Sequence, residues 1–301
     1  MRSRVPMLAL LACTGCTDIF ALPIGGGGGG DQSQPGDGGT DDAFVDLDGD
    51  TDAGDDGGSD GPLALPASCA MLACTPAMNE GDVTLSGDVM GCHAYARLTI
   101  EPLSDVTAKR DPVSGLGFAA CADVVLIAGV LEANGEGENE SSGPGAGKVC
   151  GSGGGHGGAG ADPGSCGGGG TYGDMMLPRT LGSGGGGISS SGGKGGGSIE
   201  LEADQIMLLG FINADGDPGS GASSGGGSGG SILLRATTID GAGQVNARGG
   251  LGLGLAGGGG GGGRVAIYDG SANPNLKTDV KGGSTMNGSA DGIAGTVYRF
   301  P

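Results

Sequence analysis

The feature that most constrains the fold is a repeated phrase. Residues 196–216 read GGSIELEADQIMLLGFINADG, and residues 229–249 read GGSILLRATTIDGAGQVNARG, 33 positions later. These two copies agree at 11 of 21 places, and more divergent copies stand at 115–135 and 262–282. In all four copies the fourth and sixth residues are apolar, a period-two pattern that indicates a strand with one buried face. The fourth residues are Phe118, Ile199, Ile232 and Val265.

A 21-residue unit cannot bury an apolar stripe alone, but stacked copies can cover one another. The sequence therefore predicts an all-β fold, a parallel β-helix (solenoid) with repeats of about 33 residues and long glycine-rich loops. Each repeat would be a 21-residue rung plus a 12-residue loop. Glycine runs such as 257–263 could pack as polyproline-II-like strands, since glycine alone permits that close approach, but mobile loops are the favoured interpretation.

Stacked rungs place equivalent residues in columns. At the seventh place Glu202 would pair with Arg235, and at the twentieth Asp215 would face Arg248 on the next rung. Glu200 and Glu202 are expected to point outward. The eighteenth place predicts a side-chain ladder of amides and carboxylates at a turn. Its members are Glu132, Asn213, Asn246 and Asp279.

The first 20 residues, MRSRVPMLALLACTGCTDIF, combine a charged start, an apolar run too short to span a bilayer, and small residues before a cysteine. This stretch resembles a bacterial lipoprotein signal. Cys16 is the favoured lipidation site and Cys13 the alternative, and an ordinary cleaved signal peptide is a third possibility. The resemblance, with Thr17 after Cys16, implies a lipid-anchored protein at the outer membrane or cell surface of a Gram-negative bacterium.

Processing at Cys16 would leave an even number of cysteines, which favours disulfides in an oxidising compartment. Proximity in sequence pairs Cys150 with Cys166, Cys69 with Cys74, and Cys92 with Cys121, one of 15 possible connectivities. A zinc site at His156 is disfavoured because that stretch offers three ligands and no CxxC. The six candidates are Cys69, Cys74, Cys92, Cys121, Cys150 and Cys166.

Four regions follow from these patterns: a signal at 1–16, a disordered acidic tether at 17–62, a cap with irregular first rungs at 63–114, and the repeat domain at 115–301. Residues 25–62 hold eleven aspartates and no basic residue, so they cannot bury enough apolar surface to fold. The aspartates at 46, 48, 50 and 52 alternate as in calcium loops but lack the glycine and glutamate of an EF-hand. The tether therefore predicts at most weak calcium association, and no cofactor is expected.

The phrases GGGHGG, TYG, LGSGGGG and GGGGGGRVAIY resemble glycine-rich repeat modules of bacterial surface proteins and lipoproteins. The resemblance covers roughly 82–301 and implies an architecture but no settled activity. The net charge of −20 argues against a nucleic-acid partner, whose phosphates require a basic face.

No nucleophile and base pair is legible, so the favoured function is a surface-anchored structural or adhesive lipoprotein without catalysis. Its partner beyond the membrane would be a glycan, a matrix or a protein. One alternative is a polysaccharide-active β-helix enzyme, and another is a calcium-responsive surface module. The enzyme would need an acidic groove, and the one dense acidic set is Glu200, Glu202, Asp204 and Asp215.

Overall fold

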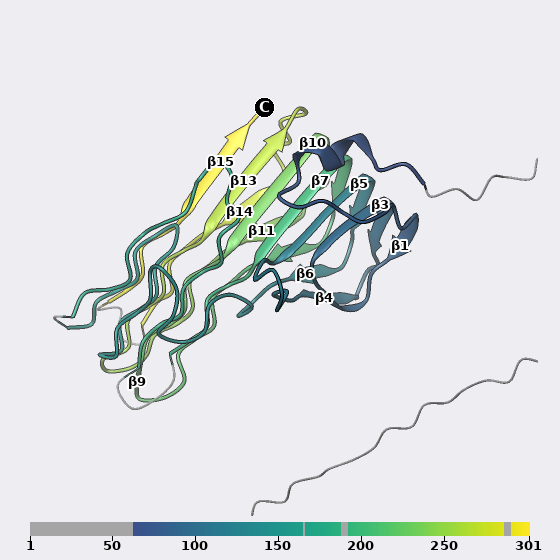
Figure 1. Ribbon diagram of the computed structural model, residues 1–301. Coiled ribbons are helices and arrows are strands. Elements are labelled where there is room, and N and C mark those ends of the chain that lie inside the picture. The colour runs from purple at the N-terminus through teal and green to yellow at the C-terminus, as the bar shows by residue number, and fades with distance from the viewer. Residues whose placement is uncertain (1–62, 165, 188–191, 286–289) are drawn as a thin grey trace, which may run out of the picture. The chain divides into compact units, whose positions relative to one another are not determined.

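The computed structural model describes residues 63–164, 166–187, 192–285 and 290–301 (Figure 1). The signal, both candidate lipidation cysteines (Cys13 and Cys16) and the acidic tether lie outside the described residues. No helix within the described part is long and apolar enough to cross a membrane. The elements are η1 (Ala67–Met71), β1 (Asp82–Thr84), β2 (Gly87–Val89), β3 (Cys92–Ile100), β4 (Asp105–Ala108), β5 (Phe118–Ile127), β6 (Val130–Glu132), β7 (Ser198–Leu208), β8 (Phe211–Asn213), β9 (Ser223–Ser224), β10 (Ser231–Asp240), β11 (Gln244–Asn246), β12 (Leu253–Gly254), β13 (Arg264–Asp269), β14 (Lys277–Asp279) and β15 (Thr296–Phe300).

Two parallel sheets form the body of the domain. Sheet A has seven strands in the order β1-β3-β5-β7-β10-β13-β15, and sheet B has six in the order β14-β11-β8-β6-β4-β2. The chain alternates between them, a strand in A being followed by a short strand in B. The predicted register is confirmed, because Ser231 lies opposite both Ser198 and Arg264, each 33 residues away.

The core lies between the two sheets and is almost entirely aliphatic. The apolar fourth and sixth residues of each copy point inward from sheet A and stack in register from β5 to β13. Sheet B contributes an aligned column of fully buried residues, Leu131, Ile212 and Val245. Burying each such side chain stabilises the fold by about 1.5–3 kcal/mol. The large inward residues of sheet A include Phe118, Ile199, Ile232, Val265, Leu201, Leu234 and Ile267.

The predicted closed β-helix is wrong. Each repeat supplies one strand to sheet A and one to sheet B, and no strand among the described residues closes these sheets into a solenoid. The segments that would have to close the coil are rich in glycine, which has no side chain to bury against the core. They instead run past the ends of the strands and associate with one another, at the lower left of Figure 1 near β9.

The glycine-rich segments form a hydrogen-bonded bundle, and their interpretation as mobile loops is wrong. Residues 225–230 donate backbone hydrogen bonds of 2.7–3.0 Å to three different neighbours in turn. The first and fourth residues of this tract donate to 183–186, the second and fifth to 258–261, and the third and sixth to 214–217. A period of three without bonds inside the tract is typical of polyproline II, which has three residues per turn. We call this region the glycine array: residues 137–164, 166–187, 192–197, 214–230, 247–263, 282–285 and 290–295.

The array requires glycine because its backbones approach too closely for a side chain. A Cβ placed on Gly227 would lie 1.9 Å from the carbonyl oxygen of Lys194. On Gly260 it would lie 2.0 Å from the carbonyl oxygen of Gly227. The glycine content that composition alone would assign to low complexity is therefore a packing requirement.

The N-terminal segment covers a face of sheet A instead of its end. Residues 82–108 form strands β1 to β4, within the region where irregular first rungs are predicted. The sequence predicts a cap before these strands, but η1 packs against β5 and β7 in the middle of sheet A. The outer face of sheet A is therefore shielded where η1 lies (Figure 1).

Candidate functional site

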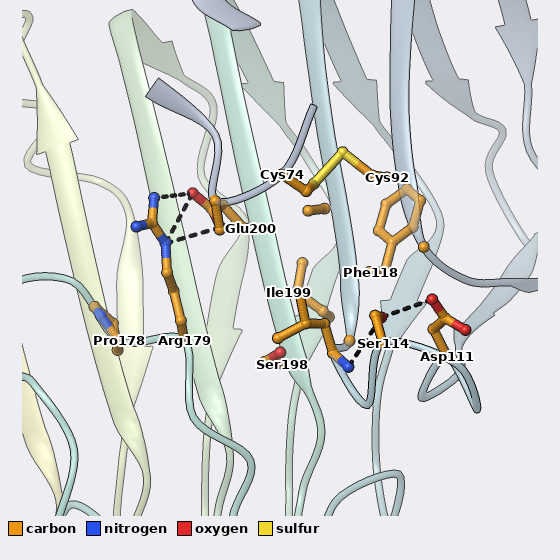
Figure 2. Close-up of a pocket in the computed structure, with 15 residues that line it drawn as sticks. Cys74, Cys92, Asp111, Ser114, Phe118, Pro178, Arg179, Ser198, Ile199 and Glu200 are labelled. Carbon is orange, nitrogen blue, oxygen red and sulfur yellow. Dashed lines mark hydrogen bonds and ion pairs between the residues drawn. A yellow bond between two sulfur atoms is a disulfide. The ribbon is translucent and has the colours of Figure 1, made fainter. Parts of the chain in front are cut away.

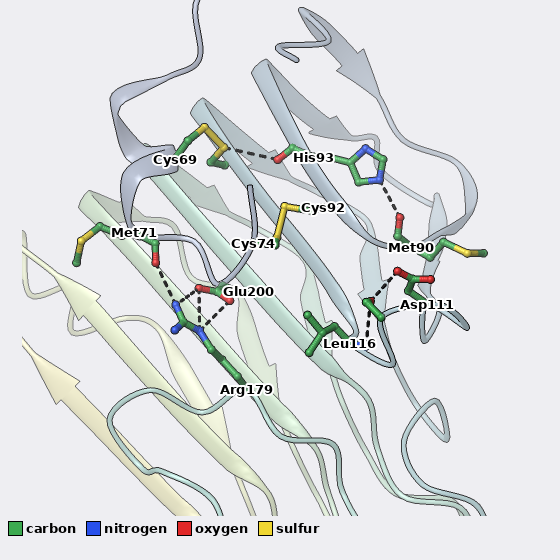
Figure 3. The surroundings of a disulfide bond; sticks show 12 residues. Cys69, Met71, Cys74, Met90, Cys92, His93, Asp111, Leu116, Arg179 and Glu200 are labelled. Atoms are coloured by element: carbon green, nitrogen blue, oxygen red, sulfur yellow. Dashed lines mark hydrogen bonds and ion pairs between the residues drawn. A yellow bond between two sulfur atoms is a disulfide. The ribbon is translucent and has the colours of Figure 1, made fainter. Parts of the chain in front are cut away.

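Two disulfides fasten the N-terminal segment to the outer face of sheet A. Cys69 bonds to Cys121 on β5, and Cys74 bonds to Cys92 on β3 (Figure 3). The predicted pairs Cys69–Cys74 and Cys92–Cys121 are therefore wrong, whereas the predicted pair Cys150–Cys166 is confirmed. The reason lies in the register: Cys92 pairs with Ala119, so Cys121 is displaced by two residues along β5. Both strand cysteines face the covering segment.

Arg179 and Glu200 form a bidentate ion pair under this cover (Figure 2). The Arg179 Nε donates to both Glu200 carboxylate oxygens at 3.2 and 3.0 Å, and Nη2 donates to Oε1 at 2.5 Å. Nη2 also donates to the Met71 carbonyl oxygen at 3.0 Å, which links the loop carrying Arg179 to η1 (Figure 3). Such fork-shaped pairing fixes the carboxylate in one orientation.

Glu202, two residues along β7, is the least satisfied charged group of the site. Its Oε1 accepts a short hydrogen bond from Arg235 Nη1, which confirms the predicted pair. Its Oε2 has no hydrogen-bond partner among the described residues, although Glu202 is only 1 % exposed. The expectation that Glu200 and Glu202 point outward needs correction: both point away from the core, yet both are buried beneath the N-terminal segment.

Burial raises the pKa of the Glu202 carboxyl to about 7, against the opposing effect of the Arg235 charge and with a further rise from Glu200. Near neutral pH this carboxyl therefore exchanges a proton easily. Glu200 and Glu202 differ accordingly, since Arg179 binds both oxygens of Glu200, whereas the buried Oε2 of Glu202 has no arginine partner.

Two cavities flank this charged row. The narrower has a volume of about 130 Å³ and mostly apolar walls, including the Cys74–Cys92 disulfide, Leu116 and Ile199, with Arg179 and Glu200 at one side (Figure 2). The wider has a volume of about 390 Å³ and lies between η1 and strands β7 and β10. Glu202 and Arg235 both line the wider cavity.

Aromatic rings continue the row across sheet A. The Arg235 guanidinium lies 4.9 Å from the centre of the Tyr268 ring on β13. The Tyr268 ring is followed on β15 by Tyr298 at 5.7 Å and Phe300 at 6.1 Å between ring centres. Phe300 is 55 % exposed. Tyr268 occupies the same seventh place as Glu202 and Arg235, so extending that column to the third copy would have found it.

The glycine array positions Arg179. His156, fully buried in the array, contacts the Gly229 carbonyl oxygen through Nδ1 and Thr180 Oγ1 through Nε2, both at 2.9 Å. Burial lowers the pKa of His156 to about 4, so its ring is neutral at physiological pH. Tyr172 packs against this ring and donates to the Leu181 carbonyl oxygen. The His156–Thr180 and Tyr172–Leu181 contacts therefore fix the backbone that follows Arg179.

The predicted column is aligned on sheet B, and its middle pair forms a side-chain hydrogen bond. Glu132, Asn213, Asn246 and Asp279 are direct neighbours on β6, β8, β11 and β14. Asn246 Nδ2 donates to Asn213 Oδ1 at 2.8 Å. The predicted Asp215–Arg248 pair also forms, at 2.6 Å, but the arginine side chain is 47 % exposed. Such a pair contributes about 0–1 kcal/mol and tunes register more than it holds the fold.

The remaining candidates have structural partners. His93 contacts Glu80 Oε1 at 2.7 Å and the Met90 carbonyl oxygen at 2.8 Å. Within the described ranges, no group of three or more His, Cys, Asp or Glu side chains is placed to hold a metal ion. Asp215 lies on the ladder side, away from Glu200 and Glu202 on sheet A, so the acidic set read from the sequence is divided between two places.

Comparison with known proteins identifies no relative: no family model, no curated protein and no solved structure matches the chain.

The pH dependence of stability tests the state of Glu202. In the folded protein its carboxyl holds a proton that the unfolded chain, with a pKa near 4.5, has released. Glu202 therefore contributes up to about 3 kcal/mol to the free energy of unfolding. This contribution is complete below pH 4.5 and is lost as the pH rises through 7. We expect the stability of the wild type relative to Glu202→Gln to fall between pH 5 and 8 in urea unfolding.

Glu101→Gln, at an exposed glutamate, is the control and should follow the wild type at every pH. The opposing titration of His156 is common to all three proteins and cancels in the differences. A wild-type curve parallel to that of Glu202→Gln from pH 5 to 8 would show that Glu202 is ionised throughout.

Proposed function

We propose that the chain is a surface-anchored structural or adhesive lipoprotein without catalytic activity, which presents the two-sheet domain to an extracellular glycan, matrix or protein. The observation that carries this proposal is the outer face of sheet A, where an open cavity with charged walls adjoins a row of aromatic rings. Tyr and Arg side chains are enriched at recognition surfaces because they combine apolar contact area with hydrogen bonding.

The anchoring part of the proposal concerns residues outside the described ones. Cys16 would carry the lipid, with Cys13 as the alternative, at the outer membrane of a Gram-negative bacterium. The three disulfides support an oxidising compartment. Labelled palmitate should enter the wild type and Cys13→Ser but not Cys16→Ser when each is expressed in a Gram-negative host. Label in Cys16→Ser but not in Cys13→Ser would show that Cys13 carries the lipid. No label in any of the three proteins would show that the chain is not lipidated.

Burial favours a binding role over catalysis. Glu200 is 5 % exposed and Glu202 1 % exposed, and each carboxyl is engaged by an arginine. A general acid must reach the bond that it protonates, and neither carboxyl has enough exposed surface for that contact. A calcium-responsive role would depend on the tether.

A polysaccharide-active enzyme is the second candidate, because Glu202 has a raised pKa beside the clamped Glu200. Glycosidases use two carboxyls that differ in this way. The row of aromatic rings does not involve that pair, and cleavage of a bound glycan distinguishes the two functions by experiment.

The test is to apply the full chain, purified in a mild detergent, to immobilised glycans and matrix proteins with and without calcium. We expect saturable binding, with bound glycans recovered at their original length. Shortened glycan products would overturn the proposal in favour of the enzyme. Binding that appears only with calcium would favour the calcium-responsive module, and no binding to any surface would remove the adhesive role.

A further inference from the structure

The wider outer-face cavity has the composition of a site for a polar but uncharged ligand. Its volume of about 390 Å³ falls in the range of small-molecule pockets. Its polar walls come from three elements, with alanines and Met71 forming the apolar part. The polar residues are Ser68, Glu202, Asp204, Arg235 and Thr237.

Glu202 lies at the wall of this cavity and anchors Arg235 there. Arg235 occupies its Oε1, and Oε2 has no partner among the described residues in spite of its burial. Buried polar atoms in native proteins nearly always have a hydrogen-bond partner, so an open one calls for an explanation. The explanation is the neighbouring Glu200 carboxylate, which can share the proton that Glu202 holds near neutral pH. Oε2 has almost no exposed surface, so the polar groups that a ligand can reach are those of Asp204, Arg235 and Thr237.

The charges around the cavity disfavour an ionic ligand. An anion would meet Glu202 and Asp204, and a cation would meet Arg235 on the same wall. Asp204 and Thr237 stand opposite each other, between the paired positions Ala203–Ala236 and Gln205–Thr238 of β7 and β10. They offer an acceptor and a hydroxyl side by side, a spacing suited to neighbouring hydroxyl groups.

We propose that this cavity binds the vicinal hydroxyl groups of a neutral saccharide, an assignment that rests on the proposed adhesive function. Asp204 accepts from one sugar hydroxyl, and Arg235 and Thr237 donate to the sugar oxygens. The Arg235 guanidinium lies over the Tyr268 ring and donates to Glu202, contacts that restrict its movement beside the cavity. Further rings of a longer chain pack their C–H faces on Tyr298 and Phe300.

The experiment measures binding of the full chain in detergent to immobilised neutral glucans, mannans and galactans, with charged glycans and matrix proteins on the same surface. Wild type, Thr237→Val and Asp204→Asn are compared with Thr238→Val, the matched control one residue along β10. Thr237 and Asp204 are exposed, so neither change should disturb folding. We expect roughly tenfold weaker binding of neutral glycans by each test variant, the loss of one hydrogen bond to a ligand hydroxyl, and no change for Thr238→Val.

The outcomes separate this inference from the proposed function. Wild-type binding to matrix protein or charged glycan alone overturns the saccharide assignment and leaves adhesion standing. Equal binding of neutral glycans by wild type and both test variants also leaves adhesion standing but places the site elsewhere. A surface that captures nothing removes both proposals.

Discussion

Replacing Gly227 by alanine is expected to lower the free energy of unfolding by about 4 kcal/mol. The new methyl group would lie 1.9 Å from the Lys194 carbonyl oxygen, so two tracts of the glycine array must separate. Overpacking alone costs about 1–3 kcal/mol, and the hydrogen bond from Gly227 to Asp217 loses its geometry as well. Urea unfolding followed by circular dichroism measures the loss.

Gly170→Ala is the matched control. An added Cβ at Gly170 would meet no atom within 4 Å, so we expect a change within about 0.5 kcal/mol. Equal and small effects of the two substitutions would show that the array is loose, because only close packing distinguishes these glycines.

Removing the Cys69–Cys121 disulfide is the second large effect that we expect. The bond closes a loop with a sequence separation of 52, for which chain entropy alone gives about 4 kcal/mol. The double variant Cys69→Ala/Cys121→Ala should also free η1 from β5, and Glu200 and Glu202 would then meet water. Thermal unfolding monitored by circular dichroism measures the loss of stability.

The pair Cys150→Ala/Cys166→Ala provides the comparison, since that bond lies in the glycine array and spans only 16 residues. Loss of this bond should lower the free energy of unfolding by about 3 kcal/mol, by the same chain-entropy reasoning. It should also leave the fall in stability between pH 5 and 8 intact, whereas the Cys69–Cys121 variant should flatten it. The same pH profile in both variants would mean that η1 covers the carboxyls without its disulfide.

The repeat predicts the pairing of strands but not the closure of the fold. Ile199, Ile232 and Val265 could be aligned from the sequence because apolar alternation has a fixed period and identical units stack in register. Whether the stack closes depends on where the intervening tracts go. Glycine carries no side-chain pattern, so nothing local distinguishes a mobile loop from a tract whose bonds run to three distant neighbours.

The residues of the candidate site could be predicted only where they occupy equivalent positions in successive repeats. Glu202 with Arg235 came from the seventh place, and Tyr268 belongs to the same column. Arg179 could not be found in this way, because it reaches Glu200 from a non-repeating insertion positioned through His156 and Thr180. The burial of Glu200 and Glu202 likewise depends on disulfides whose connectivity sequence proximity predicts wrongly.

The glycine array is a folded, hydrogen-bonded structure that positions the site on sheet A. Amide hydrogen exchange tests it most directly, because exchange reports whether backbone bonds open. We expect the amides of 225–230 and 258–263 to exchange as slowly as those of β7 and β10, because their donors are bonded at 2.7–3.0 Å. Exchange of both tracts at the rate of an unfolded chain, with β7 and β10 protected, would contradict it.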